Sequence, residues 1–170
     1  MKKNPLLAAL GILLGAALGN IFLYAGLMKH LSPYAFSEAV LAYQLGPPAL
    51  AGLVAAVLPW LELTVGFILV LGYLLEVVGR MFLALGSNRG EGLIGGIKRR
   101  SCLLWIMAAM AGFVLVMAIT MARGLKIDCG CGLFFQRQVG WAVLLEDVLL
   151  FLLAAGLYWW ELPGVEEVKE

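Results

Sequence analysis

The chain has 170 residues, of which 63% are hydrophobic and only 14% are charged, and its mean hydropathy is +0.98. Soluble domains are nearer to about 45–50% apolar and about 25% charged, so this composition predicts an integral membrane protein. The net charge of +1 leaves no basic surface for nucleic acid and excludes that class of function.

Four apolar runs are long enough to cross a bilayer core, which takes about 20 residues. They cover residues 5–27, 49–75, 102–121 and 139–160. The runs are continuously apolar rather than alternating, so they indicate helices and not membrane β-strands. Short connections favour antiparallel neighbours, and we expect an all-α, up-down four-helix membrane bundle that forms a single domain over residues 1–170.

The first run carries three glycines at four-residue spacing, Gly11, Gly15 and Gly19. This spacing places them on one helix face, where small residues let two helices approach closely in lipid. The face serves packing within the bundle or a homodimer, and the sequence leaves both uses open.

Glu62 lies near the middle of the second run, three residues after Pro59. A carboxyl group at that depth costs about 2.5–3.5 kcal/mol on insertion scales, so it signals function or a specific partner. Glu62 is interpreted as a protonated side chain, a partner in a hydrogen bond to a neighbouring helix that fixes packing, or a proton carrier beside a quinone.

Lysine and arginine in the connections predict the orientation. With a cytoplasmic N-terminus, eight basic residues lie inside and four outside. The inner set is Lys2, Lys3, Arg80, Arg89, Lys98, Arg99, Arg100 and Lys169, and the outer set is Lys29, Arg123, Lys126 and Arg137. Both termini are therefore expected in the cytoplasm of a bacterium, with the protein crossing its inner membrane four times. The inner loop 76–100 is then the longest connection, and an outer aromatic belt is expected at Tyr24, Tyr34, Tyr43 and Trp141.

The stretch "KIDCGCG" places Cys129 and Cys131 in the outward loop before the fourth run. That loop lies in an oxidising compartment, where thiol pairs become disulfides. Gly130 removes a side-chain obstacle to so small a ring, and a strained exposed disulfide tends to be labile or catalytic. The alternatives are a static disulfide, two separate thiols or a metal clip. Metal has little support, because zinc normally takes four ligands and His30 is the only histidine.

Glu146 and Asp147 enter the fourth run from its outer end. Adjacent helical residues point to different faces, so at most one of them faces the bundle centre. We expect a structural ion pair with one of the outer cations, Lys29, Arg123 or Arg137.

Four segments in this order resemble the MauE/DoxX-like redox-associated membrane proteins: "AGLMKHLSPYAFSEAVLAYQLGPP", "LPWLELTVGFILVLG", "RGLKIDCGCG" and "LLEDVLLFLLA". The resemblance covers about residues 18–153 and implies a four-span inner-membrane protein. MauE relatives are associated with maturation of methylamine dehydrogenase, whose small subunit is rich in disulfides. DoxX-like relatives are linked to thiosulfate oxidation with quinone as acceptor.

By position, Cys129 and Cys131 match the Cys-x-Cys motif of the family, Glu62 matches its membrane glutamate, and Lys29 matches the lysine that ends the first span. The chain departs from the family pattern where Gly132 follows Cys131, since Cys-Gly-Cys-Phe-Gly is common there. The inner loop is also longer than we expect for the family.

Two hypotheses for the function follow. The first is a thiol–disulfide redox protein, whose Cys129–Cys131 pair exchanges electrons with an exported thiol protein, a membrane quinone or both. The second is a non-enzymatic anchor or assembly subunit of a larger membrane complex, or a DoxX-like subunit in sulfur oxidation. Besides the lipid bilayer and a protein partner, quinone is the candidate co-reactant, and no resident cofactor is firmly implied.

Overall fold

The computed structural model describes residues 5–84, 93–130 and 138–161, with side chains for 6–79, 99–130 and 138–161. The described chain forms five helices: α1 (Pro5–Leu31), α2 (Pro33–Ala42), α3 (Pro48–Ala84), α4 (Leu93–Ala122) and α5 (Trp141–Glu161). Within these residues, every helix except α2 is long and apolar enough to cross a membrane. The prediction of an all-α protein with four spanning helices is confirmed.

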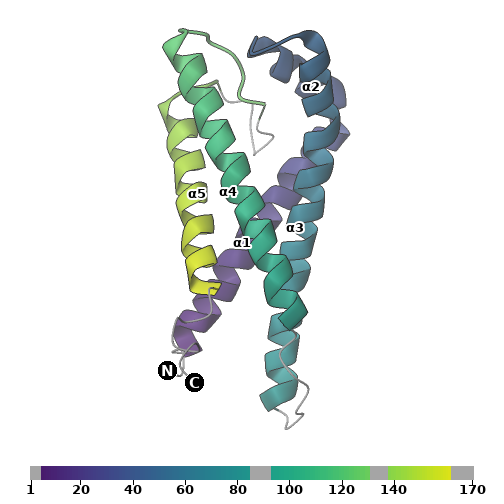
Figure 1. The fold of residues 1–170 in the computed structure, drawn as a ribbon, viewed down its shortest axis with the longest axis vertical. Coiled ribbons are helices and arrows are strands. Elements are labelled where there is room, and N and C mark those ends of the chain that lie inside the picture. Colours follow the sequence, from purple (N-terminus) through teal and green to yellow (C-terminus); the bar gives the residue numbers. More distant parts are fainter. Residues whose placement is uncertain (1–4, 85–92, 131–137, 162–170) are drawn as a thin grey trace, which may run out of the picture.

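The four long helices run alternately up and down (Figure 1). Gly15 of α1 faces Tyr73 of α3, while Gly26 faces Leu63, so residue numbers rise along one helix as they fall along the other. The short helix α2 lies where α1 ends and α3 begins, and this end of the bundle is called the α2 end below. At the opposite end, the start of α1 lies beside the end of α5 (Figure 1).

The helices extend beyond the apolar runs that predicted them. Residues between the first two runs were expected to be a connection, but they complete α1 and form α2. Pro33 supplies the fixed backbone angle that suits a first helical turn, which explains why a new helix starts there. Helices α3 and α4 likewise continue into the expected loop 76–100, because a helix ends at a break in backbone hydrogen bonding and not where hydropathy falls. Residues 85–92 of that loop lie outside the described residues.

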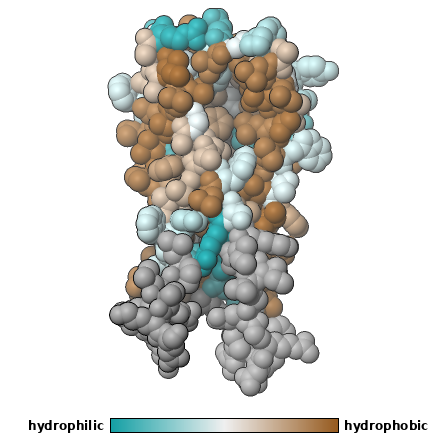
Figure 2. Space-filling model, viewed as in Figure 1, coloured by the Kyte–Doolittle hydropathy of each residue, from teal (hydrophilic) through white to brown (hydrophobic). Residues whose placement is uncertain are grey.

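Apolar side chains cover the outside of the bundle as well as its core. Leu6 and Leu13 on α1 are 75% and 67% exposed, and Leu149 on α5 is 66% exposed. Hydrophobic residues dominate the visible face between the two ends, and hydrophilic residues gather at the α2 end (Figure 2). This surface suits lipid, so the protein is a multi-pass membrane protein.

Glycines set the close approach of α1 and α3. A Cβ atom on Gly66 would lie 2.5 Å from the backbone nitrogen of Leu23 and 2.7 Å from the carbonyl oxygen of Gly19. A Cβ on Gly15 would overlap the ring of Tyr73. At Gly15 and Gly19 the glycine face is thus filled by α3 of the same chain, which is the first of the two uses left open by the sequence.

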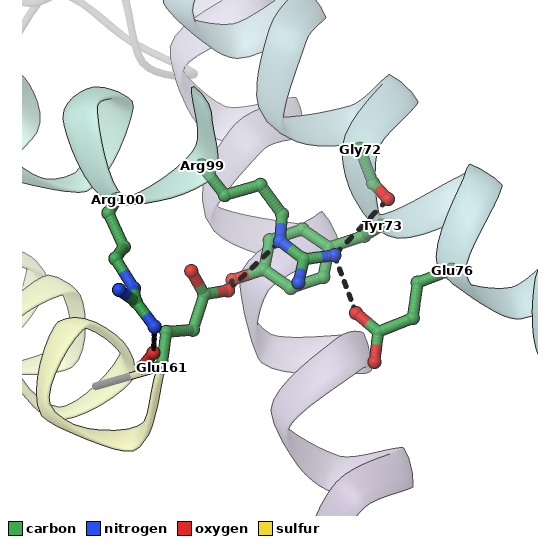
Figure 3. A network of polar contacts seen from close by, with 6 residues as sticks. All are labelled: Gly72, Tyr73, Glu76, Arg99, Arg100 and Glu161. Atoms are coloured by element: carbon green, nitrogen blue, oxygen red, sulfur yellow. Dashed lines mark hydrogen bonds and ion pairs between the residues drawn. The ribbon is translucent and has the colours of Figure 1, made fainter. Parts of the chain in front are cut away.

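Charged side chains join α3, α4 and α5 at the opposite end (Figure 3). An Nη1 atom of Arg99 donates to Oε2 of Glu76 at 2.6 Å, and its Nε lies 3.2 Å from Oε1 of Glu161. The Tyr73 hydroxyl donates to the same Glu161 oxygen at 2.9 Å, and Arg100 donates to the Glu161 backbone carbonyl. The sequence assigned both arginines only to the inner charge count, so this cluster was not predicted.

The glycine contacts predict a position-specific cost of added volume. Replacing Gly66 with alanine should lower the free energy of unfolding by about 1–3 kcal/mol, because backbone atoms of α1 cannot move aside cheaply. Thermal unfolding in detergent micelles measures this loss.

Gly52 on the same helix is the matched control, because no described atom lies within 4 Å of its would-be Cβ. Gly52→Ala should be neutral or slightly stabilising. Equal melting temperatures for the two variants would contradict the packing described here.

Candidate functional site

The turn that carries Cys129 lies at the α2 end, between α4 and α5. Gly130 has a φ of +68°, a backbone conformation that side-chain-bearing residues rarely adopt. A Cβ atom there would also lie 2.8 Å from the Cβ of Ala39 on α2. The expectation that this turn needs glycine between the two cysteines is confirmed at Gly130.

The Cys129 side chain is buried at 4% exposure and is disulfide-bonded. Cys131, the second predicted site cysteine, lies outside the described residues. Cys102, by contrast, is a buried free thiol near the start of the spanning part of α4. Cys129 therefore belongs to a covered part of the α2 end, whereas the sequence favoured an exposed bond.

Tyr43, which follows α2 as its C-terminal cap, holds the turn that carries Cys129 through a hydrogen bond. Its hydroxyl donates to the backbone carbonyl of Cys129 at 2.7 Å, and its ring packs with Met117 of α4 and Val143 of α5. Arg123 in turn donates to the backbone carbonyl of Tyr43 at 2.9 Å. Residues from three helices and the α4–α5 connection thus meet around Cys129.

The sequence placed Tyr43 in an aromatic belt at the membrane surface, whereas the structure buries it at 7% exposure. Burial, with a smaller contribution from the charge of Asp147, raises the pKa of its hydroxyl to about 12. Tyr43 accordingly remains a neutral donor at physiological pH. A tyrosine in the connection between the first two apolar runs was the only sequence signal, and it does not separate a residue at the membrane surface from a buried donor.

A buried ion pair joins α1 and α3 deeper in the bundle. Nζ of Lys29 lies 2.7 Å from both carboxylate oxygens of Glu62, and both side chains are 3% exposed. Gly26, one turn before Lys29, makes the pair reachable: a Cβ there would lie 2.9 Å from the Pro59 carbonyl oxygen and 2.9 Å from the Leu63 nitrogen. Among the interpretations of Glu62, the structure has the hydrogen bond to a neighbouring helix.

Asp147 lies in the same part of the bundle without such a partner. Its side chain is 6% exposed, and its Oδ2 atom has no hydrogen-bond partner among the described residues. Of the three cations expected as partners for the two acids, Lys29 pairs with Glu62 instead. Arg137 lies outside the described residues, so the ion pair expected for Glu146 or Asp147 stays a prediction. Of the two adjacent acids, Asp147 is the one that faces inward, and Glu146 is half-buried.

A small cavity brings these three charged residues together. Its wall comes from all four spanning helices, and its polar lining consists of Lys29, Glu62 and Asp147. The cavity volume is about 30 Å³, whereas pockets for small organic ligands are about 300–1,000 Å³. The cavity accommodates water but not the ring of a quinone.

The turn that carries Cys129 lies next to the charged cavity. Val143 belongs to the same buried cluster as Cys129, and Asp147 comes one helical turn after Val143 on the same face of α5. Tyr43, bonded to Cys129, also senses the charge of Asp147. The structure therefore brings together four of the five predicted site residues, namely Cys129, Glu62, Lys29 and Asp147.

No cluster that could hold a metal ion occurs among the described residues: none of them forms a group of three or more histidine, cysteine, aspartate or glutamate side chains in suitable positions. The polar chemistry of the site is thus that of one cysteine sulfur, one tyrosine hydroxyl, an ion pair and a single carboxyl group.

These features define a class: a multi-pass helical membrane protein with a cysteine turn at one end and a buried charged cavity beneath it. The family model described as methylamine utilisation protein MauE matches residues 6–160. The chain belongs to this family. The comparisons with curated proteins and with solved structures give no match.

Breaking the ion pair should destabilise the bundle. Lys29→Met and Glu62→Gln each leave a buried group without its partner, which typically costs about 3–5 kcal/mol. Lys29→Met should cost more, because it leaves two acids in one cavity, while in Glu62→Gln the ammonium group still has Asp147 nearby. Thermal unfolding in micelles gives both values.

The double variant Lys29→Met/Glu62→Gln is the control, because it removes both charges together and combines the two single changes. It should be more stable than Lys29→Met alone. A double variant whose loss equals the sum of the single losses would show that the two side chains do not act as a pair.

The contribution of Tyr43 to the free energy of unfolding should be lost at alkaline pH. Its pKa is raised from 10 in the unfolded chain to about 12 in the fold, so the neutral hydroxyl favours folding. The contribution is complete below about pH 10 and declines as pH rises toward 12. Tyr43→Phe loses a hydrogen bond worth about 1 kcal/mol. The stability difference from wild type should therefore shrink between these pH values, and a difference that stays constant would be inconsistent with a buried Tyr43 donor.

Proposed function

We propose that this member of the MauE family is a thiol–disulfide redox protein of the bacterial inner membrane. Its Cys129–Cys131 pair would exchange electrons with an exported thiol protein, with membrane quinone or with both, in support of a periplasmic system. The main support is the placement of Cys129, a disulfide-bonded cysteine fixed by Tyr43 at the end of the bundle that carries α2. The family description adds methylamine utilisation as the setting.

The proposed orientation rests on charge. Eight lysines and arginines belong to the sequence before α1, from Arg80 to Arg100 and after α5, against four elsewhere. Under the positive-inside rule, the end opposite α2 is therefore the cytoplasmic end. Both termini are then cytoplasmic, and the α2 end faces the oxidising compartment where disulfides persist.

The proposed reaction transfers two electrons. The exported thiol protein is called the client here. A thiolate of the client attacks one sulfur of the Cys129–Cys131 disulfide and forms a mixed disulfide, and the other sulfur leaves as a thiolate. The second client thiol resolves the mixed disulfide, so the client becomes oxidised and both cysteines become thiols. Quinone from the bilayer, acting as a substrate, then accepts two electrons and two protons as the cysteine disulfide forms again.

Burial suggests the order of attack. At 4% exposure, the sulfur of Cys129 is shielded from an incoming protein thiolate by Tyr43, Met117 and Val143. We therefore assign Cys131 as the sulfur that is attacked and Cys129 as the leaving group.

Trapping of mixed disulfides tests this assignment. In a Cys102→Ser background, Cys129→Ser leaves Cys131 as a lone thiol, whose thiolate attacks the disulfide of the oxidised client in the reverse of the proposed exchange. The mixed disulfide should accumulate, because Cys129 is no longer present to displace the client from Cys131. The matched variant Cys131→Ser should accumulate none. Acid-quenched membranes, separated without reductant and analysed by mass spectrometry, give the readout. Complex formation through Cys129 alone would reverse the assignment, and no complex with either variant would argue against client exchange.

A non-catalytic anchor or assembly subunit is the second candidate. The burial of Cys129 favours it, because a covered disulfide resists exchange and behaves as a structural link. Under this alternative, replacing both Cys129 and Cys131 by serine leaves the activity of the supported periplasmic system intact. Gly66→Ala should lower that activity, because it impairs folding of the bundle.

A further inference from the structure

The cavity between the four spanning helices has an unbalanced charge. Lys29 contributes one positive charge, and both oxygens of Glu62 are engaged with its Nζ at 2.7 Å. Asp147 is the third polar residue of the wall and brings a second acid. If all three were ionised, the cavity would carry one uncompensated negative charge inside a membrane protein, which is strongly unfavourable.

Among the described residues, the other elements around Asp147 supply no further cation to the cavity wall. Helix α4 contributes Met110 and Phe113 to the same wall, and Tyr43 after α2 is a neutral hydroxyl. On α5 itself the adjacent charged residue is Glu146, which is another acid. A proton is the simplest species that neutralises Asp147.

The cavity also provides room for the water that would carry such a proton. A buried water needs about 10–15 Å³ and two to four polar partners. The cavity offers about 30 Å³, and the unpartnered Oδ2 of Asp147 lies in its wall together with the Lys29–Glu62 pair.

We propose that this cavity is a hydrated proton-binding site, in which Asp147 takes up and releases a proton while Lys29 and Glu62 remain paired. Asp147 is a positioning and proton-holding residue and does not touch the reacting sulfur. Lys29 brings a positive charge to the same wall as Asp147, and the rest of the lining is apolar.

The site also has a role in the reaction, and this step rests on the proposed function. Oxidation of the two thiols by quinone moves two protons from the cysteines to the quinol. Asp147 lies one turn from Val143, which belongs to the same buried cluster as Cys129 and Tyr43. Tyr43 donates a hydrogen bond to the carbonyl of Cys129 and is close enough to Asp147 to respond to its charge. We assign Asp147 as the group that receives one thiol proton on its way into the bilayer.

The composition of the chain allows a direct test, because Asp128 and Asp147 are its only aspartates. Aspartate labelled with carbon-13 at the side-chain carboxyl gives two NMR signals from the full-length protein in lipid nanodiscs. Asp128 is exposed and serves as the internal reference, and Asp128→Asn assigns its signal. The Asp147 signal should move between its protonated and ionised positions between about pH 5 and 9.

An Asp147 signal that stays at the ionised position, or at the protonated position, across this range would overturn the proton-binding site. The measurement needs no turnover and no variant at Asp147. It therefore stands whether or not the cysteine pair is redox-active.

Matched variants test the role in the reaction. Asp147→Asn should slow re-oxidation of the reduced cysteine pair in quinone-containing membranes at least about tenfold. Glu146→Gln removes a neighbouring carboxyl group that does not line the cavity and should stay within about twofold of wild type.

The pH profile separates a proton-holding role from a structural one. The wild-type rate of re-oxidation should follow the titration of the Asp147 signal, and the Asp147→Asn rate should lose that dependence. Equal slowing in both variants, or an unchanged pH profile in Asp147→Asn, would contradict the role in the reaction. A wild-type pair that never re-oxidises would contradict the proposed function instead.

Discussion

The ion pair between Lys29 and Glu62 is the constraint on which the arrangement of the bundle depends. Two opposite charges buried at 3% exposure tolerate little change in separation, because each would otherwise be left alone in an apolar interior. Gly26 and Gly66 satisfy this constraint, since they let the backbones of α1 and α3 approach closely in the turns of α1 that precede Lys29. The pair therefore fixes the register of α1 against α3.

The positions of the other residues of the candidate site depend on this register of α1 against α3. With α1 fixed on α3, the polar face of the pair is directed toward α4 and α5, and Asp147 completes the wall of the cavity. Helix α2 follows directly after α1, so its position is set as well, and Tyr43 at its end reaches the carbonyl of Cys129. At the opposite end, Arg99 and Glu161 hold α4 and α5 to α3 by a second polar cluster (Figure 3). The bundle is thus held by polar contacts at three levels, and lipid-facing leucines surround them.

The spanning helices could be predicted from the sequence because hydropathy and length are local properties. The need for glycine at position 130 and the special status of the carboxyl group of Glu62 were also predictable, since a tight turn and a carboxyl group in a membrane each have few solutions. Pairing was not predictable in the same way. Lys29 and Glu62 are 33 residues apart, and Tyr43 and Cys129 are 86 apart, so their contacts depend on how the helices pack. Hydropathy alone also assigned α2 to a connection, because ten residues are too few to span a bilayer.

An acid-quenched alkylation assay tests most directly whether the cysteine pair turns over in the membrane. Cys129 and Cys131 are labelled in native membranes from cells with and without respiratory quinone, and their thiol and disulfide states are counted by mass shift. We predict mainly disulfide when quinone is present and a shift to dithiol when quinone is depleted. A state that remains the same under both conditions would contradict a redox role that uses quinone and would favour a structural disulfide.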